Sequence, residues 1–345
     1  MKLLPVFLVL VLSFISSARA ADAEATSVGL AMTEAAQAYL AALDTDDLAI
    51  AVMDFNDPRR LDWHNIPKPE RKGLQLHDMT AQQQERCHAL LRAALSKDGY
   101  VRVVNILALE NNLREGEKDL VGGHLRDPLR YFLTIFGEPE ATGTWGWSFE
   151  GHHCSLNFVV RDGQVVSDTP SFWGANPATV KIFVEGGPAV GTRTLEQEEQ
   201  LGFDLLASLD DTQRKQAVIA DKAPDDYRNA GLPDPPHDKP AGLPAPAMTL
   251  EQRGLLEALL RAYTGHLAPE LAAARMRDIG SNNWRDIRFA WLGATKPGIG
   301  HAYRIQGPTF LLELVNVQSD PQGNPANHIH SVWRTLPHDF AVTAK

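Results

Sequence analysis

Residues 145–167 read WGWSFEGHHCSLNFVVRDGQVVS, and this stretch decides the fold class. It is rich in aromatic and β-branched residues that alternate with smaller or polar ones, which is typical of strands. Asp162-Gly163 is a strong hairpin signal. We therefore expect a long strand over 145–160 that turns at this dipeptide and returns over 165–167, as part of an antiparallel sheet.

Further strands are predicted near the C-terminus, where Gly and Pro separate four short runs rich in β-formers. These runs cover 287–291, 302–306, 310–317 and 328–333. A lone hairpin is only marginally stable in water. We therefore expect the C-terminal strands, within 287–333, to share one sheet with the hairpin at 145–167.

Helical periodicity surrounds both groups of strands. The predicted helices cover 35–43, 79–95, 104–113, 127–135, 194–209, 211–220, 249–266 and 269–276. Thr80, followed three residues later by Gln83, predicts a capping box, and Thr249 is a predicted cap of a later helix. We find no internal repeat of fixed period, and strands do not alternate regularly with helices. The sequence therefore predicts an α+β fold, with a mostly antiparallel sheet packed with helices.

The net charge and the N-terminal residues indicate which partners and which cellular location to expect. The chain has 345 residues and a formal net charge of −10, with no basic run, which argues against a nucleic-acid partner. Residues 1–20 combine Lys2, an apolar run and small residues ending at Ala20, the pattern of a secretory signal peptide. The apolar run is too short to span a bilayer. We expect a periplasmic or secreted protein that leaves the membrane after cleavage.

The mature chain, 21–345, is predicted to form a single α+β domain, with a Pro-rich loop at 223–246. Its two cysteines are Cys87 and Cys154. Export permits a disulfide between them, and the sequence leaves open whether they come within reach.

The candidate chemistry begins with a His-x-His motif at 327–334, which reads NHIHSVWR. His328 and His330 are two residues apart, so on a strand both imidazoles point to the same face. One strand then offers two nitrogens to one ion, an arrangement common in metal sites built on sheets. We predict that both are metal ligands.

A third ligand is predicted in the hairpin. On a continuous strand, His153 shares its polar face with Phe149, Gly151, Ser155 and Asn157. His152 is on the opposite face, which becomes apolar and is predicted to point into the core. We therefore predict His153 as a ligand, with His152 as its substitute or as a residue that supports the ligands.

Glu313 is a lone carboxylate in an otherwise apolar strand-like run. A buried carboxylate is costly unless it is paired or bound to a metal, so Glu313 is predicted as a fourth ligand or general base. In the alternative interpretation, Glu313 pairs with Arg304 or Arg334 across the sheet, and the histidines line an exposed face or satisfy hydrogen bonds in the core.

Several motifs resemble, in order, the domain-of-unknown-function family 3500. They are Gly146-Trp147 with Gly151-His152-His153, the stretch from Thr169 to Pro177, Phe289-Ala290-Trp291 with Gly293, and the stretches from Tyr303 to Pro308 and from Asn327 to Arg334, with Glu313 between them. The resemblance runs from about Thr80 to the C-terminus. It implies membership of a family with no established activity.

These observations predict an exported metal-dependent enzyme that acts on a small molecule or peptide. A site of neutral imidazoles suits zinc, copper or iron. With zinc the expected reaction is hydrolysis by a metal-bound water, and with copper or iron it is oxidation. The alternatives are a periplasmic metal- or ligand-binding protein without catalysis, and a structural domain with satisfied histidines.

Overall fold

The computed structural model describes residues 28–118, 125–281 and 284–342; the predicted signal peptide lies outside them. The strands are β1 (Val52–Met53), β2 (Leu74–Gln75), β3 (Phe132–Phe136), β4 (Thr144–Gly151), β5 (Cys154–Arg161), β6 (Gln164–Ser167), β7 (Ser171–Ala175), β8 (Val218–Ala220), β9 (Leu243–Pro244), β10 (Arg288–Gly293), β11 (His301–Gln306), β12 (Phe310–Gln318) and β13 (His328–Thr335). The helices are α2 (Thr45–Ala51), α3 (Ala81–Ala94), α4 (Lys97–Glu117), α5 (Glu196–Ser208), α6 (Asp211–Ala217), α7 (Leu250–Thr264) and α8 (Pro269–Ser281). A further helix covers 28–40.

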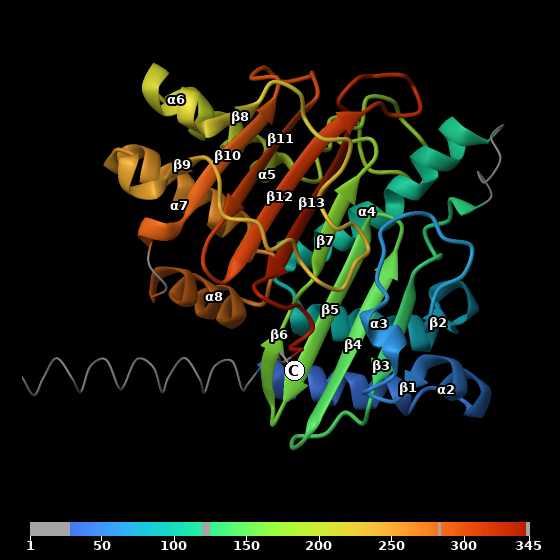
Figure 1. Ribbon diagram of the computed structural model, residues 1–345. Coiled ribbons are helices and arrows are strands. Elements are labelled where there is room, and N and C mark those ends of the chain that lie inside the picture. The colour runs from blue at the N-terminus through green and yellow to red at the C-terminus, as the bar shows by residue number, and fades with distance from the viewer. Residues whose placement is uncertain (1–27, 119–124, 282–283, 343–345) are drawn as a thin grey trace, which may run out of the picture.

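All the described strands belong to one continuous sheet (Figure 1). Its order is β1-β3-β4-β5-β7-β13-β12-β11-β10-β8, with β2 beside β3, β6 beside β5 and β9 beside β10. Strand pairs are antiparallel except β1 with β3 and β8 with β10. The α+β fold and the shared, mostly antiparallel sheet are thus confirmed.

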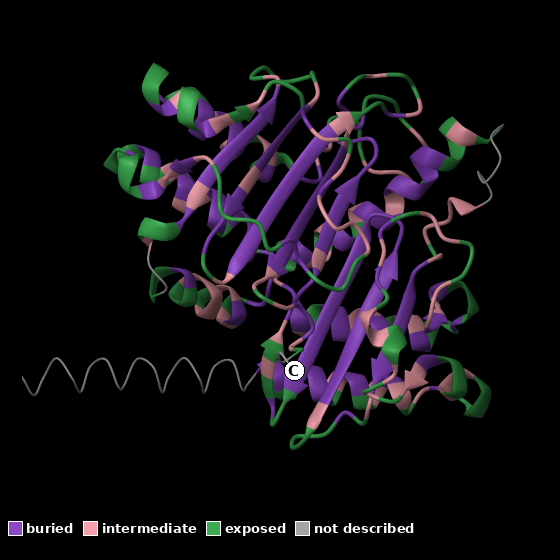
Figure 2. Ribbon diagram, in the orientation of Figure 1, coloured by how far each residue is buried: buried purple, intermediate pink, exposed green. Residues whose placement is uncertain are grey.

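The two faces of the sheet are covered differently. Helices pack on one face, where the main hydrophobic core lies. The other face, which we call the loop-covered face, lies beneath the long connections 54–73 and 221–242, which cross in front of the strands in Figure 1. A second, smaller core lies there, and it includes Trp63, Phe172 and Tyr227. The central strands are buried from both sides (Figure 2).

An internal repeat relates the two halves of the chain, so our expectation that there is none is wrong. Residues 73–93 and 242–262 align without a gap, and ten of the 21 positions are identical. The identical pairs are Gly73/Gly242, Leu74/Leu243, Met79/Met248, Thr80/Thr249, Gln83/Gln252, Ala89/Ala258, Leu90/Leu259, Leu91/Leu260, Arg92/Arg261 and Ala93/Ala262.

The repeated segments make the same local contacts. Thr80 with Gln83 and Thr249 with Gln252 form capping boxes at the starts of α3 and α7. The glutamine amides then donate to equivalent carbonyls before α2 and α6, those of Ala42 (3.2 Å) and Ser208 (2.8 Å). Each glutamine therefore stabilises its own helix and also fixes the preceding one.

The strand order repeats as well. Each half of the sheet starts at one edge and ends at the centre. From one edge the order is β1-β3-β4-β5-β7, from the other edge it is β8-β10-β11-β12-β13, and the two halves meet where β7 pairs with β13. In Figure 1 the first half is blue to green and the second is yellow to red, on either side of this junction. The sheet is therefore built from two similar halves related by an approximate two-fold axis.

Two strands and one turn differ from the sequence-based expectation. The predicted helix over 127–135 is wrong, because 132–136 forms β3; a fully buried Phe-Leu-Thr-Ile-Phe run has no alternation that separates strand from helix. The Pro-bounded segment 169–177 was not among the predicted strands, yet it contains β7. The predicted long strand 145–160 is two strands, β4 and β5, which turn at His152-His153.

A buried ion network ties the helices to the sheet. The carboxylate of Glu198 on α5 accepts hydrogen bonds from Arg102 (2.5 Å) and faces Nε2 of His266 at 2.5 Å. Burial alone would raise the pKa of Glu198, but Arg102 and His266 outweigh it and lower this pKa to about 2.

No helix among the described residues is long and apolar enough to cross a bilayer.

Candidate metal centre

The turn between β4 and β5 positions the first histidine. Gly151 pairs with Cys154, so His152 and His153 are the two turn residues, and His153 has a left-handed backbone with φ = 61°. Because of this turn, the side chains before and after it do not alternate between the two faces as they would along one continuous strand. Ser155 therefore keeps the face predicted for it, whereas Gly151 shares the opposite face with Cys154. The predicted grouping of Phe149 and Gly151 with His153 is wrong for this reason.

The other two histidines lie on β13, on the loop-covered face. His330 pairs with Val315 of β12 on one side and with Gly174 of β7 on the other. Gly174 also faces the ring of His153, which belongs to the turn between β4 and β5. A Cβ at Gly174 would lie 2.9 Å from Cδ2 of His153, so only glycine leaves room for that imidazole at its observed position.

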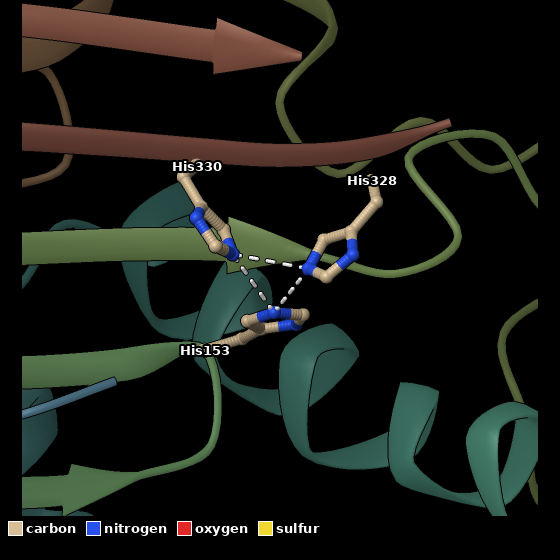
Figure 3. A group of neighbouring side chains, drawn as sticks. All are labelled: His153, His328 and His330. Atoms are coloured by element: carbon tan, nitrogen blue, oxygen red, sulfur yellow. Dashed lines mark hydrogen bonds between the residues drawn. The ribbon is translucent and has the colours of Figure 1, made fainter. Parts of the chain in front are cut away.

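The three imidazoles converge through the same ring nitrogen (Figure 3). Nε2 of His153 lies 2.9 Å from Nε2 of His328 and 3.3 Å from Nε2 of His330, and the remaining side of the triangle is 3.0 Å. His153 and His330 are buried and His328 is half-buried. These three residues form a group that could hold a metal ion.

A group behind the ring fixes the proton of one imidazole. Nδ1 of His330 lies 2.9 Å from Oδ1 of Asp226, and a carboxylate only accepts, so Nδ1 carries a proton and Nε2 of the neutral ring has a lone pair. Behind His328, the amide nitrogen of Asn176 lies 3.2 Å from Nδ1, and Oδ1 of the same amide has no partner among the described residues. A half-turn of this amide would turn Oδ1 toward Nδ1 as an acceptor.

The surroundings favour neutral rings. Burial, reinforced by the neighbouring histidines, lowers the pKa of His153 well below its ordinary value. Burial likewise lowers the pKa of His328 to about 3, with His330 adding to the shift. His153 and His328 are therefore neutral near neutral pH, the form in which imidazole binds metals.

His152 lies beside this cluster and outside the converging group. Its ring stacks on His153 with centroids 3.7 Å apart, while Nδ1 is 2.5 Å from Glu110 of α4 and 3.0 Å from Arg126. Burial raises the pKa of Glu110 to about 8 and lowers the pKa of His152. The structure therefore places His152 as a support behind His153 rather than as a substitute ligand.

Glu313, predicted as a fourth ligand or general base, is held elsewhere on the same face. Its Oε1 accepts from Nε of Arg228 at 2.7 Å and from Nε of Arg304 at 2.9 Å. Its oxygens are not part of the converging group of ligand atoms. The two guanidinium groups neutralise the buried charge, which includes the pairing with Arg304 considered as the alternative. Glu313 is therefore not placed as a fourth ligand, and its role as a general base stays a prediction.

Sequence reasoning missed Asp226, Asn176 and Gly174, which support the three histidines. Asp226 lies in the long connection after β8, where composition indicates only a loop. Gly174 and Asn176 belong to the Thr169–Pro177 motif, whose proline boundaries hid a strand. Their roles depend on which strands become neighbours, and local sequence does not specify that.

The comparisons with known proteins identify the family. The family described as "Protein of unknown function (DUF3500)" matches residues 26–342, nearly the whole chain. This chain belongs to the DUF3500 family. No curated protein and no solved structure matches it. The family match extends the resemblance noted in the sequence to the N-terminal residues before Thr80, and it assigns no activity.

Proposed function

We propose that this DUF3500 member is an exported metalloenzyme whose ion is held by Nε2 of His153, His328 and His330. The observation that supports it best is the convergence of three Nε2 atoms within 2.9–3.3 Å of one another. The carboxylate of Asp226 accepts from Nδ1 of His330, so a neutral His330 directs its Nε2 lone pair into this group. A cation at the centre would be bound by all three imidazoles.

The spacing of the three nitrogens agrees with one tetrahedral ion. With metal–nitrogen bonds of about 2.0–2.1 Å, neighbouring ligand atoms in a tetrahedron are about 3.3–3.4 Å apart. The nitrogens here are 2.9–3.3 Å apart, so movements of a few tenths of an ångström at most complete the geometry. Asp226 behind His330 then supplies the carboxylate–histidine arrangement that orients metal ligands and raises their basicity.

Three neutral imidazoles would leave a divalent ion with its full charge. Zinc bound by them would supply the chemistry of a water with a pKa lowered to about 7, which suits hydrolysis. A carboxylate among the ligands would favour the non-haem iron type of site, and Glu313 is tied to two arginines instead. We therefore favour zinc-dependent hydrolysis over oxidative chemistry with copper or iron.

Export is the second part of the proposal. It rests on the signal-peptide pattern of residues 1–20 and its expected cleavage after Ala20. Sequencing the N-terminus of protein recovered from outside the cytoplasm should find Ala21 first. An intact Met1 on that material would contradict this part while leaving the metal site untouched.

The metal site is tested by elemental analysis of untagged protein purified without chelators. One ion per chain is expected in the wild type, and none in His330→Ala. Ile329→Val is the matched control on the same strand, because Ile329 is buried on the opposite, helix-packed face; it should keep the metal and lose roughly 0.5–1.5 kcal/mol of stability. Wild-type protein that binds no zinc, copper or iron after refilling would overturn the proposal.

The fourth coordination position of the ion distinguishes an enzyme from a protein that only binds metal, because an enzyme is expected to leave it open to water. In cobalt-substituted protein, an open position holds a water whose ionisation changes the visible spectrum with pH. An ion with a fourth protein ligand would show no such titration, and it would favour a metal-binding protein without catalysis.

A further inference from the structure

A cavity of about 580 Å³ lies at the end of the sheet, and one of its lining residues, Gln318, is the strand partner of His328. It is formed by the segment after β8, the connection between β10 and β11, and the end of β12, which meet at the upper end of the sheet in Figure 1. Its lining residues are Asp221, Lys222, Ala223, Asp225, Ala294, Ile299, Gly300, Val317 and Gln318. Its size is in the range of small-molecule sites.

Strand β12 and the segment that contains Asp225 both connect this cavity to the three histidines. Gln318 pairs with His328, and a bulge between Asn316 and Gln318 leaves Val317 beside that histidine on the loop-covered face. Adjacent strands are about 4.8 Å apart, so the cavity wall begins one strand from the ligand. On its other side the cavity is lined by Asp225, the residue before the Asp226 that contacts His330.

The two halves carry different side chains beside two equivalent glycines. Gly137 after β3 and Gly293 of β10 both have left-handed backbones, with φ of 78° and 86°. A Cβ at Gly137 would lie 3.3 Å from Cβ of Phe55, and one at Gly293 would lie 2.9 Å from Cβ of Ala223. The half that carries His328 and His330 thus has a methyl group beside its glycine where the other half has a phenyl group, and this methyl group lines the cavity.

The lining indicates the chemistry of the occupant. Ala223, Val317 and Ile299 supply apolar surface, and Asp221 and Asp225 at the exposed rim have no ion-pair partner among the described residues. Lys222 is also exposed at the rim, so the rim carries a net charge of −1. An apolar stem with a positively charged end satisfies both parts of this lining.

We propose that this cavity binds the substrate of the metal centre, and that the substrate carries an apolar stem ending in a protonated amine. The reacting group reaches the metal, the stem crosses Val317, and the ammonium group meets Asp221 and Asp225. The proposal rests on the proposed metalloenzyme for the reaction, whereas the amine-binding cavity itself does not require a bound ion.

The first experiment tests the cavity without using the metal. Saturation-transfer NMR is recorded with hexylamine and with hexanoate on the purified full-length mature protein. Binding of hexylamine and none of hexanoate is expected. Ala223→Phe places in the cavity the side chain that the first half already accommodates, so it should fold and lose hexylamine binding. Equal signals from both ligands, or unchanged hexylamine binding in Ala223→Phe, would overturn the proposal.

The second experiment connects the cavity to the metal. Hydroxamates bind metal ions through two oxygens, so we compare aminohexanohydroxamic, hexanohydroxamic and acetohydroxamic acids on zinc-loaded protein by calorimetry. The amine is expected to bind about threefold to tenfold tighter than its uncharged analogue, and the difference should vanish in the Asp221→Asn/Asp225→Asn double variant. Ala223→Phe should bind acetohydroxamate normally and lose the advantage of the longer compounds.

The two failures are distinguishable. Protein that binds no metal and no acetohydroxamate, yet binds hexylamine in an Ala223-dependent way, refutes the proposed metalloenzyme and keeps the amine cavity. Protein that binds acetohydroxamate but discriminates neither charge nor chain length refutes the cavity as the substrate site and keeps the metal centre.

Discussion

Gly174→Ala is the substitution that most directly tests the geometry of the metal centre. The new Cβ would lie 2.9 Å from Cδ2, 3.0 Å from Cγ and 3.2 Å from Cβ of His153. Non-bonded carbons are comfortable at about 3.5–4.0 Å. The imidazole must therefore move by about half an ångström or more, away from position 174.

That displacement should weaken metal binding more than it weakens the fold. Sites that bind metals tolerate errors of only about 0.5 Å, and disturbing residues behind the ligands typically costs 10–100-fold in affinity. We expect a loss of that size for Gly174→Ala. Overpacking should lower the free energy of unfolding of the metal-free protein by about 1–3 kcal/mol.

The assay is competition for zinc against a chromophoric chelator, with urea denaturation of the metal-free protein in parallel. Gly254→Ala is the matched control, because a Cβ at this position in α7 has nothing within 4 Å. It should leave zinc affinity unchanged and raise stability by about 0.5–1 kcal/mol. The double variant Gly174→Ala/His153→Ala should regain stability without regaining zinc. If Gly174→Ala binds zinc as tightly as the wild type, His153 is not a ligand.

Three further predictions concern the support of the site, the buried charge and the repeat. Asp226→Asn should weaken zinc binding about tenfold by removing the acceptor behind His330, measured by the same competition; unchanged affinity would show that this contact does not orient the ring. Glu198 has an ordinary pKa of 4.5 and a folded-state pKa of about 2, so its contribution of about 3 kcal/mol should be present above pH 4.5 and lost as pH falls toward 2. Urea titrations of wild type and Glu198→Gln at pH 6 and pH 3 should show a stability gap that narrows in acid, and a constant gap would contradict this assignment. Thr80→Ala and Thr249→Ala should each cost about 1 kcal/mol and add in the double variant, since the two caps are equivalent and independent; strongly unequal costs in thermal unfolding would argue against equivalent roles.

Periodicity and composition sufficed for the fold class because most elements have one strong local signal. The capped helices at Thr80 and Thr249 and the strands 288–293 to 328–335 lie close to their predicted positions. Sequence alternation failed to identify β3, because this strand is buried on both faces and a strand without a solvated face shows no alternation of polar and apolar residues. It failed again at 152–153, because two histidines give no local indication of a turn.

The candidate site was predictable in part for a related reason. His328 and His330 lie on one strand, so their common orientation follows from spacing alone. The approach of His153 depends on β7 lying between β5 and β13, with glycine at position 174. Glu313 was predicted as a ligand because a buried carboxylate signals a partner without specifying which one, and Arg228, one of the two arginines that contact it, lies 85 residues away in the chain.

The repeat also explains why one metal centre, and not two, is expected in each chain. Gly151 and Cys154 enclose the turn His152-His153, and the equivalent Gly307 and Phe310 enclose Pro308-Thr309. The place of His153 is thus taken in the second half by Thr309, whose hydroxyl donates to Asp278 at 3.1 Å. A neutral hydroxyl already bonded to a carboxylate is a poor substitute for imidazole. The proposed site therefore takes one histidine from the first half and two from the second, so under this proposal neither half would bind the ion alone, and the junction of β7 and β13 brings the three histidines together.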